Sequence, residues 1–234
     1  MAGESIENNL RLVREKIAQA ASRAGRALAS VQLIAVSKTK PAAAIEAAMR
    51  AGQKSFGENY VQEALEKITA FPSADWHFIG SLQSNKVKQI VGKVSLIHSV
   101  DRRKLVDEIA KVAEQNGLVQ DVLIEIHIGG EESKQGLALE EAPALLEHIQ
   151  TLKSLRVRGL MALPPLTEDE STARRSFGVL RESLAKWHRE IFSRENGQHF
   201  TELSMGTSSD FEWAILEGAT LVRVGTTIFG AREN

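Results

Sequence analysis

The sequence contains no cysteine and only one tyrosine, Tyr60, among its 234 residues. The absence of cysteine excludes disulfide bonds, thiolate metal sites and cysteine nucleophiles, and it suits a protein of a reducing compartment. The scarcity of tyrosine leaves Tyr60 as the one candidate for any reaction that needs a tyrosine base.

A large net charge and long apolar runs are absent as well. The net charge is −1 and the pI is about 6.6, so no overall positive field attracts nucleic acid or an anionic membrane. No window approaches the roughly 20 apolar residues of a membrane span. The stretch Met1–Arg14 carries Glu4, Glu7 and Arg11, where a signal peptide needs an apolar run. We therefore expect a cytoplasmic protein that binds neither nucleic acid nor membranes.

No Gly/Ser-rich linker or low-complexity tract divides the chain, so we predict one domain over residues 1–234. Strand-like runs alternate with helical patterns, which predicts parallel strands with right-handed crossovers. The expected strands cover residues 31–37, 55–58, 76–80, 96–100, 122–128, 156–162, 202–205 and 221–224. The expected helices cover residues 5–24, 42–51, 61–70, 103–116, 139–152, 171–194 and 209–217.

Eight strand–helix units in this length fit an α/β fold, the single-domain (β/α)8 TIM barrel. The helix that precedes the first strand is then extra, and it could cover the N-terminal mouth of the barrel. The competing architecture is an open doubly wound sheet. Such a sheet would offer a glycine fingerprint after its first strand, and the residues there are Ser37-Lys38-Thr39-Lys40-Pro41. We therefore predict the barrel.

In a barrel of this kind the chemistry belongs at the C-terminal ends of the strands, and Lys38 stands at the end of the first one. It follows the apolar run Leu33–Val36, where the chain leaves the core. Desolvation makes a lysine amine nucleophilic toward a carbonyl group. The alternative is that Lys38 and Lys40 are solvated loop charges.

Two glycine-bearing turns near the end of the chain favour the first interpretation. Ser208 and Ser209 follow Gly206, and Ser209 with Glu212 matches the capping box that begins a helix. The last strand ends in Gly225-Thr226-Thr227. Loops after strands 7 and 8 recurrently bind phosphate in this fold, through free backbone N–H groups and hydroxyls.

Arg223 interrupts the apolar run of the last strand. An arginine that points into a barrel needs a partner, because a buried unpaired charge costs several kcal/mol. A phosphate, a ring nitrogen or a structural carboxylate would serve. His77, His98 and His127 lie in strand runs without the spacing of metal ligands, so we expect core hydrogen-bonding groups and no metal.

These segments resemble the pyridoxal phosphate homeostasis proteins, the YggS-like family, whose fold is similar to the N-terminal barrel of alanine racemase. The resemblance covers nearly the whole chain. The motifs that carry it are residues 33–41 (LIAVSKTKP), 56–63 (FGENYVQE), 76–86 (WHFIGSLQSNK), 130–136 (GEESKQG), 158–161 (RGLM), 203–210 (LSMGTSSD) and 222–232 (VRVGTTIFGAR).

The resemblance implies a fold-type III barrel that binds pyridoxal 5′-phosphate. Lys38 would form the internal aldimine, a Schiff base with the cofactor aldehyde, and Asn59 would lie beside the cofactor. The implied phosphate ligands are Ser208, Gly225 and Thr226, and Arg223 would face the pyridine nitrogen. Thr207 departs from the methionine that is usual in this family, which bears on the packing of that side of the cofactor.

The function implied is cofactor binding in intracellular vitamin B6 homeostasis, without an established reaction. Pyridoxal phosphate is the expected ligand, apo-enzymes that require it are candidate partners, and a monomer is expected. A permanent cation beside the pyridine nitrogen disfavours its protonation and so weakens the ring as an electron sink. The alternatives are a racemase-like enzyme acting on amino acids, and a Schiff-base aldolase or phosphosugar enzyme with the same lysine and phosphate loops. Lys134 is a weaker candidate for a second aldehyde-binding amine.

Overall fold

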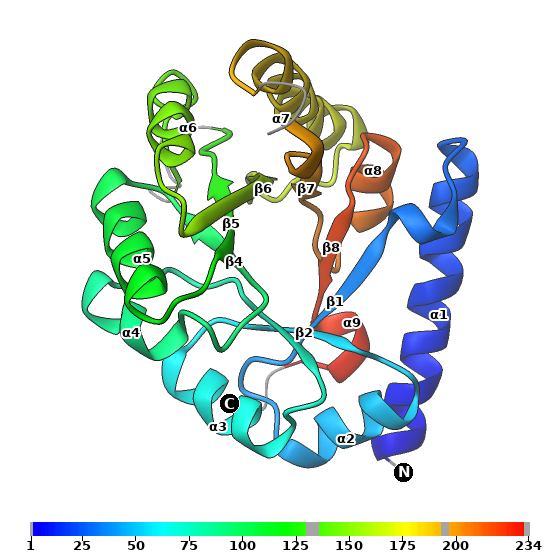
Figure 1. The fold of residues 1–234 in the computed structure, drawn as a ribbon. Coiled ribbons are helices and arrows are strands. Elements are labelled where there is room, and N and C mark those ends of the chain that lie inside the picture. Colours follow the sequence, from blue (N-terminus) through cyan, green and yellow to red (C-terminus); the bar gives the residue numbers. More distant parts are fainter. Residues whose placement is uncertain (1, 130–135, 193–196, 232–234) are drawn as a thin grey trace.

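The computed structural model describes residues 2–129, 136–192 and 197–231, and within them eight strands close into a barrel (Figure 1). The strand order follows the chain from β1 to β8. Every neighbouring pair is parallel, including β8 with β1. Helices surround the barrel on the outside. The predicted (β/α)8 barrel is confirmed, and the open doubly wound sheet is excluded.

The strands lie within three residues of their predicted bounds. They are β1 (Gln32–Val36), β2 (Ser55–Glu58), β3 (Asp75–Phe78), β4 (Leu96–Val100), β5 (Gln120–Glu125), β6 (Leu155–Met161), β7 (Glu202–Ser204) and β8 (Leu221–Val224). Because all eight run the same way, the residues that follow them gather at one end of the barrel.

The helices differ from prediction mainly at their ends. The helix expected from residue 139 begins at Ala142, and a proline stands in its first turn, where the missing N–H costs nothing. The helices are α1 (Ala2–Arg23), α2 (Ala42–Arg50), α3 (Val61–Ala70), α4 (Val87–Ile90), α5 (Arg103–Gln115), α6 (Ala142–Gln150), α7 (Glu170–Glu190), α8 (Phe211–Leu216) and α9 (Thr226–Phe229). Three short 3-10 helices complete the set: η1 (Leu28–Ser30), η2 (Ser84–Lys86) and η3 (Gly197–His199).

Two separate apolar clusters stabilise this barrel. The larger one lies between the strands and the helices, and it includes the outward-facing Trp76 and Phe78 of β3. The smaller one joins residues from strands on opposite sides of the barrel, which can meet only in its interior. Its members are Ile34, Leu96, Leu123, Met161 and Leu221. The outer cluster is much the larger, so most of the hydrophobic stabilisation comes from the contact of helices with strands.

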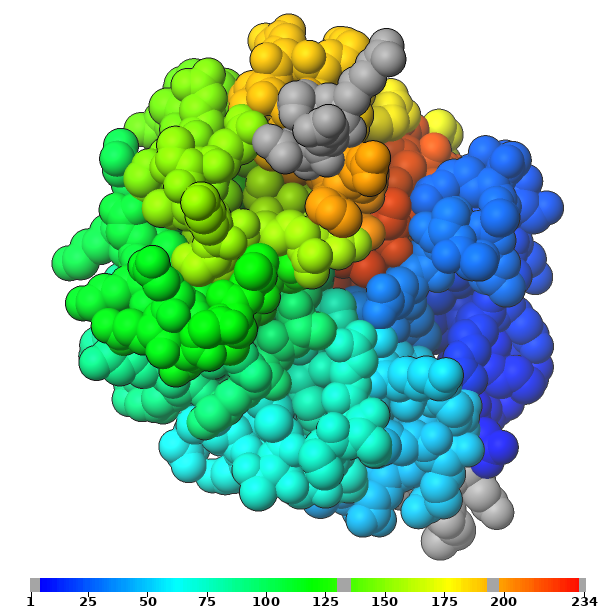
Figure 2. All heavy atoms as spheres, viewed as in Figure 1, coloured from blue at the N-terminus to red at the C-terminus, as the bar shows by residue number. Residues whose placement is uncertain are grey.

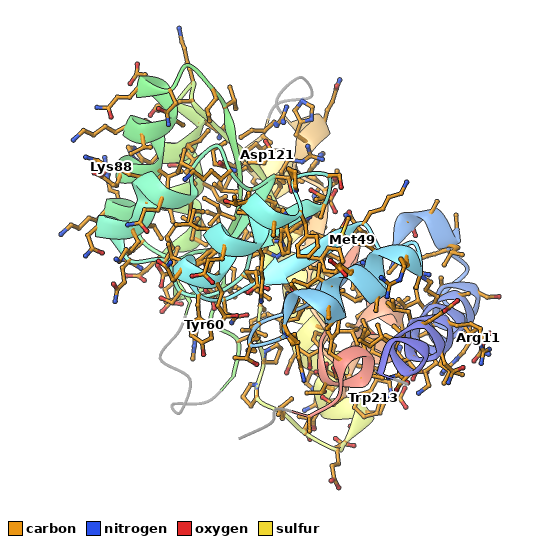
Figure 3. The ribbon with its side chains drawn as sticks, turned by 90° about the horizontal axis from the view of Figure 1, so that it is seen from below. Arg11, Met49, Tyr60, Lys88, Asp121 and Trp213 are labelled. Atoms are coloured by element: carbon orange, nitrogen blue, oxygen red, sulfur yellow. The ribbon has the colours of Figure 1, made fainter. Side chains whose placement is uncertain are left out.

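The helix α1 does not cover a mouth of the barrel. It packs along the side, against α2, α8 and α9 (Figures 1 and 2), and Trp213 of α8 lies beside it (Figure 3). The buried Leu10, Val13 and Ile17 form the helical stripe that faces these neighbours. Asn9 Nδ2 donates to the carbonyl oxygen of Ile228 at 3.0 Å. The helix therefore ties the segment that precedes β1 to the segment that follows β8.

The approach of β6 to β7 makes a prediction about stability. Gly159 has a φ of 153°, and a Cβ on it would lie 1.9 Å from the carbonyl oxygen of Glu202. We expect Gly159→Ala to lower the free energy of unfolding by about 3 kcal/mol or more, because the backbone of β7 would have to move. Urea unfolding measures this change as a lower midpoint.

The matched control is Gly178→Ala in α7, where the nearest atoms to a Cβ, in the side chains of Arg181 and Glu217, would lie 3.8 Å away. Alanine favours a helix interior over glycine by about 1 kcal/mol, so this variant should be as stable as the parent or more so. Equal destabilisation by the two substitutions would contradict the steric argument.

Candidate functional site

A cavity of about 450 Å³ opens at the end of the barrel where the strands finish, a size that suits a small cofactor. Its lining residues come from the ends of β1, β2, β3, β6, β7 and β8. They are Val36, Lys38, Lys40, Asn59, Ile79, Leu163, Leu166, Thr207, Ser208, Ser209, Arg223, Gly225, Thr226 and Gly230. The structure thus brings together in one cavity all six residues that the sequence singled out, although they span 189 positions of the chain.

Lys38 stands just beyond β1, in a tight turn, and its side chain is half-buried. The backbone N–H of Lys40 donates to the carbonyl oxygen of Ser37 at 3.0 Å and closes the turn. Thr39, at its tip, has a φ of 63°, a conformation that residues with a branched side chain rarely adopt. Its backbone N–H donates to Oε2 of Glu63 at 2.7 Å, which helps to hold this conformation.

A buried ion cluster supports this turn from α3. Lys67 Nζ donates to the carbonyl oxygen of Ser37 at 2.7 Å, to Glu58 Oε1 at 2.8 Å and to Glu63 Oε2 at 3.0 Å. The hydroxyl of Ser37 donates to the same Glu58 oxygen at 2.6 Å. Burial raises the pKa of Glu58, against the opposing effect of the Lys67 and Ser37 hydrogen bonds. The sequence does not reveal this cluster, because Glu63 and Lys67 have the i,i+4 spacing of an ordinary surface ion pair on a helix.

Asn59 follows β2 and presents an unsatisfied amide to the site. Its Oδ1 atom is buried and has no hydrogen-bond partner within the described part of the chain. A buried carbonyl-type oxygen left without a donor costs about 1–3 kcal/mol. The Asn59 backbone is closely packed as well, since a Cβ on Gly80 would lie 2.1 Å from its carbonyl oxygen. The Asn59 backbone is therefore closely packed, and its side-chain oxygen has hydrogen-bonding capacity to spare.

Ser208 joins the loops that follow β7 and β8. Its hydroxyl oxygen accepts from the backbone N–H of Gly225 at 3.1 Å and lies 3.5 Å from that of Thr227. A side chain at Gly225 would be tightly packed, because a Cβ there would come within 3.3 Å of the carbonyl oxygen of Val36. Backbone N–H groups and hydroxyls therefore converge on one wall of the cavity.

The predicted capping box at Ser209 is wrong. The helix α8 begins at Phe211, with Asp210 as the preceding residue, and no side chain caps it. Asp210 Oδ1 instead accepts from the backbone N–H of Thr207 at 2.6 Å and from the Thr207 hydroxyl at 3.0 Å. The Asp210 carboxylate is thus bonded within this turn and does not cap α8. The Thr207 side chain is thereby folded back onto its own loop.

Arg223 lies in the barrel interior at the base of the cavity and is 4% exposed. Its guanidinium donates to the Ser204 hydroxyl oxygen at 2.5 Å and to the carbonyl oxygen of Ala162 at 2.9 Å, both uncharged acceptors. Burial lowers the pKa of Arg223 to about 10, against the attraction of Glu125 and Asp210. Of the three partners considered for this arginine, a hydrogen-bonded carboxylate is not found among the described residues.

Glu125, at the end of β5, is a buried carboxyl group that attracts Arg223 electrostatically. Burial together with Asp101 raises the pKa of Glu125 to about 7, while Arg223 acts in the opposite direction. At neutral pH only part of the Glu125 population carries a charge. Glu125 therefore balances the charge of Arg223 only in part, and Asp210 adds a further attraction.

His77 and His98, in the barrel interior, are buried hydrogen-bonding groups, as the sequence predicts. Lys134 lies outside the described residues. Within the described ranges, no three His, Asp or Glu side chains could hold a metal ion together, and no helix is long and apolar enough to cross a membrane. The apolar wall formed by Ile79, Leu163 and Leu166 was missed, because loop residues carry no periodic signal.

The sequence matches the family "Alanine racemase, N-terminal domain" over residues 4–233. A pyridoxal phosphate homeostasis protein of Aquifex aeolicus is 48% identical over 223 residues, covering 94% of this chain and 96% of its own. Proteins of the same name from Pseudomonas aeruginosa and Escherichia coli are 43% and 42% identical, each with 96% or more of both chains covered.

Solved structures agree with this assignment. A protein of Bifidobacterium adolescentis described as unknown is 34% identical, with a TM-score of 0.91 over 97% of this chain and 96% of its own. PipY of Synechococcus elongatus, in a structure described as having PLP bound, is 38% identical, with a TM-score of 0.78 over 92% of this chain and 100% of its own.

Alanine racemase of Corynebacterium glutamicum shows the same fold at 15% identity, with a TM-score of 0.70 over 99% of this chain and 62% of its own. The chain belongs to the family of the pyridoxal phosphate homeostasis proteins, which is built on the N-terminal domain of alanine racemase.

Proposed function

We propose that this protein binds pyridoxal 5′-phosphate in the cavity at the end of the barrel and serves to hold and supply the cofactor inside the cell. The observation that carries the proposal is the placement of an amine, Lys38, in the same 450 Å³ cavity as the loop pair around Ser208 and Gly225. An amine and an anion-binding wall are what an aldehyde that carries a phosphate requires. The printed names of the relatives support the choice of ligand.

The phosphate end fits the residues present. In the proposal Ser208, Gly225 and Thr226 hold the phosphate through a hydroxyl and backbone N–H groups, which are good donors to an anion. The absence of a side chain at Gly225 lets the backbone approach closely, and a Cβ there would lie only 3.3 Å from the Val36 carbonyl oxygen. Lys38 would condense with the aldehyde, which forms a carbon–nitrogen double bond and releases water.

The ring end fits as well. Asn59 offers a buried amide oxygen without a partner, and Ile79, Leu163 and Leu166 offer apolar surface for a flat ring. Arg223 would face the pyridine nitrogen with a charge that neutral acceptors and a partly ionised Glu125 leave incompletely balanced. When bound, the cofactor supplies an electron sink only in proportion to the protonation of that nitrogen. A permanent cation beside it opposes that protonation.

The proposal therefore excludes an established reaction on amino acids. Tyr60, the one tyrosine, lies beyond β2 and is 52% exposed, so no buried tyrosine is available as a base opposite Lys38. In the same proposal the chain works as one domain over residues 1–234, as a cytoplasmic monomer, and delivers its cofactor to apo-enzymes that require it. The absence of cysteine and the net charge of −1 support the cytoplasmic location.

The first prediction concerns the amine. Lys38→Ala should abolish the visible absorption band of the bound cofactor, because the covalent link is lost, while far-ultraviolet circular dichroism stays unchanged. Borohydride reduction followed by peptide mass mapping should place the label on Lys38 in the parent. Lys40→Ala is the control, since Lys40 lines the same cavity but donates to the carbonyl oxygen of Ala231. A label found mainly on Lys40 or Lys134 would show that the amine is misassigned.

A second prediction concerns the phosphate wall. Ser208→Ala should weaken binding of pyridoxal phosphate by about 10- to 100-fold, because a hydrogen bond to a charged acceptor contributes about 1.5–3 kcal/mol. Binding of pyridoxal, which lacks the phosphate, should change little. Ser30→Ala, at an exposed serine before β1 that does not line the cavity, is the control and should leave both affinities unchanged. Equal weakening for the two ligands, measured by fluorescence titration, would contradict the assignment.

The third prediction concerns the lack of a reaction. The cofactor-loaded parent should exchange no α-hydrogen of added amino acids in deuterium oxide, because Arg223 opposes protonation of the ring nitrogen. Arg223→Glu should gain slow exchange, since a carboxylate in that place favours the protonated ring. Proton NMR of the amino acid measures both rates. Rapid exchange by the parent would identify an enzyme instead.

A further inference from the structure

A chain of hydrogen bonds crosses the barrel interior and ends on Arg223. His77 Nε2 lies 3.0 Å from Asp75 Oδ2, and His77 Nδ1 lies 2.9 Å from His98 Nε2. His98 Nδ1 lies 2.9 Å from the hydroxyl oxygen of Ser204. That oxygen accepts from Arg223 Nη1 at 2.5 Å. Five side chains from β3, β4, β7 and β8 are thus connected without a gap.

The chain begins at the other mouth of the barrel. Asp75 is the first residue of β3, its side chain is 38% exposed, and it also accepts from the hydroxyls of Ser55 at 2.9 Å and Ser95 at 2.5 Å. Figure 3 shows the two ends of the barrel through Asp121, near the start of β5, and Tyr60, beyond the end of β2. The chain of hydrogen bonds runs from the end near Asp121 to the cavity floor.

The chemistry of the carboxylate end gives this chain one direction. At the other end a guanidinium only donates, so the Ser204 oxygen accepts from Arg223. A hydroxyl oxygen has a second lone pair as well as its own proton, so this end alone leaves the direction of the Ser204–His98 hydrogen bond open. A carboxylate only accepts, so His77 Nε2 carries the proton that faces Asp75. A neutral His77 then accepts at Nδ1, and His98 must carry its proton on Nε2.

The carboxylate of Asp75 therefore sets both tautomers, and the Ser204 hydroxyl then donates to His98 Nδ1. Burial, with the positive charge of Arg223 near it, lowers the pKa of His98 well below its ordinary value, which agrees with a neutral ring. At the far terminus burial opposes ionisation of Asp75, but the hydrogen bonds from His77, Ser95 and Ser55 lower the pKa of Asp75 below its ordinary range. The chain thus links a carboxylate to a guanidinium through neutral groups.

We propose that Asp75 is a positioning residue for Arg223: by fixing the tautomers of His77 and His98 it leaves the Ser204 oxygen free to accept from the guanidinium. Without this constraint, a His98 that carried its proton on Nδ1 would donate to the same oxygen. The Ser204 oxygen would then accept from two donors at once and no longer donate to His98, so its hydrogen bond with Arg223 would be weaker. The proposal rests on the proposed function only in that Arg223 faces the bound cofactor. Asp75 itself touches neither the cavity nor its contents.

The first measurement detects the tautomers of His77 and His98 directly. In protein labelled with ¹⁵N-histidine, the ring nitrogens of His77 and His98 should show both rings neutral and protonated on Nε2 at pH 7. In Asp75→Ala, which removes the acceptor, these signals should move toward values averaged over two tautomers. In Asp75→Asn, which keeps an acceptor oxygen, the parent pattern should return. Asp121→Ala is the matched control, because Asp121 accepts from Arg156 and Arg158 near the same mouth and contacts no histidine.

The second reading is the affinity for cofactor. Asp75→Ala should weaken pyridoxal phosphate and pyridoxal by the same factor, about three- to tenfold, as expected when one hydrogen bond that orients Arg223 is weakened. This differs from Ser208→Ala, which should separate the two ligands. Ser204→Ala should also weaken both ligands but keep the tautomers, because Asp75 still holds the other end; altered tautomers in this variant would overturn the proposal.

A parent His98 protonated on Nδ1 or on both nitrogens would overturn the proposal, whatever the variants do. So would an Asp75→Ala protein whose ring signals and affinities equal those of Asp121→Ala. A parent that binds no pyridoxal phosphate would overturn the proposed function and the role toward the cofactor. Even then, the ¹⁵N signals of His77 and His98 would show whether Asp75 fixes their tautomers and so keeps the Ser204 oxygen available to Arg223.

Discussion

The parallel pairing of β1 with β8 is the interaction on which the site depends. Its register sets Ile34 opposite Arg223 and Ala35 opposite Val224, so that Gly225 arrives beside Val36. A slip by one residue would turn Arg223 from the barrel interior to the outer shell, because side chains alternate along a strand. The same register brings the turn after β1 to the loop after β8. The cavity is thus a product of barrel closure, and no single strand–helix unit contains it.

The polar interior of the barrel is tolerated because the outer shell provides the stability. Most buried apolar side chains lie between strands and helices, and only a small cluster lies inside. The interior can therefore hold His77, His98 and Arg223, each with hydrogen-bond partners, at the cost of apolar packing. A similar division applies at Lys38, where the buried Lys67 cluster holds the turn from behind and leaves the cavity side to the amine.

The sequence is most informative where a pattern is local. Alternating strands and helices predict the barrel, and the motifs around Lys38 and Ser208 predict residues that the structure does bring to one cavity. The predictions fail where side chains compete or where the contact is not local. At Ser209 the expected cap fails because Asp210 bonds to Thr207, and both residues are typical of turns. The His98–Ser204 contact joins strands that are not neighbours, so its prediction would require the stagger of the closed barrel.

The seam between β1 and β8, with α1 packed across it, also bears on how the protein is made. The two strands that close the barrel are separated by nearly the whole chain, and α1 finds α8 and α9 only after both have been synthesised. Contacts of such long sequence separation form late, since loop closure must precede them. On the ribosome the earlier units can collapse, but closure waits for the last strand. A nascent chain that still lacks β8 therefore has neither a closed barrel nor a complete cavity.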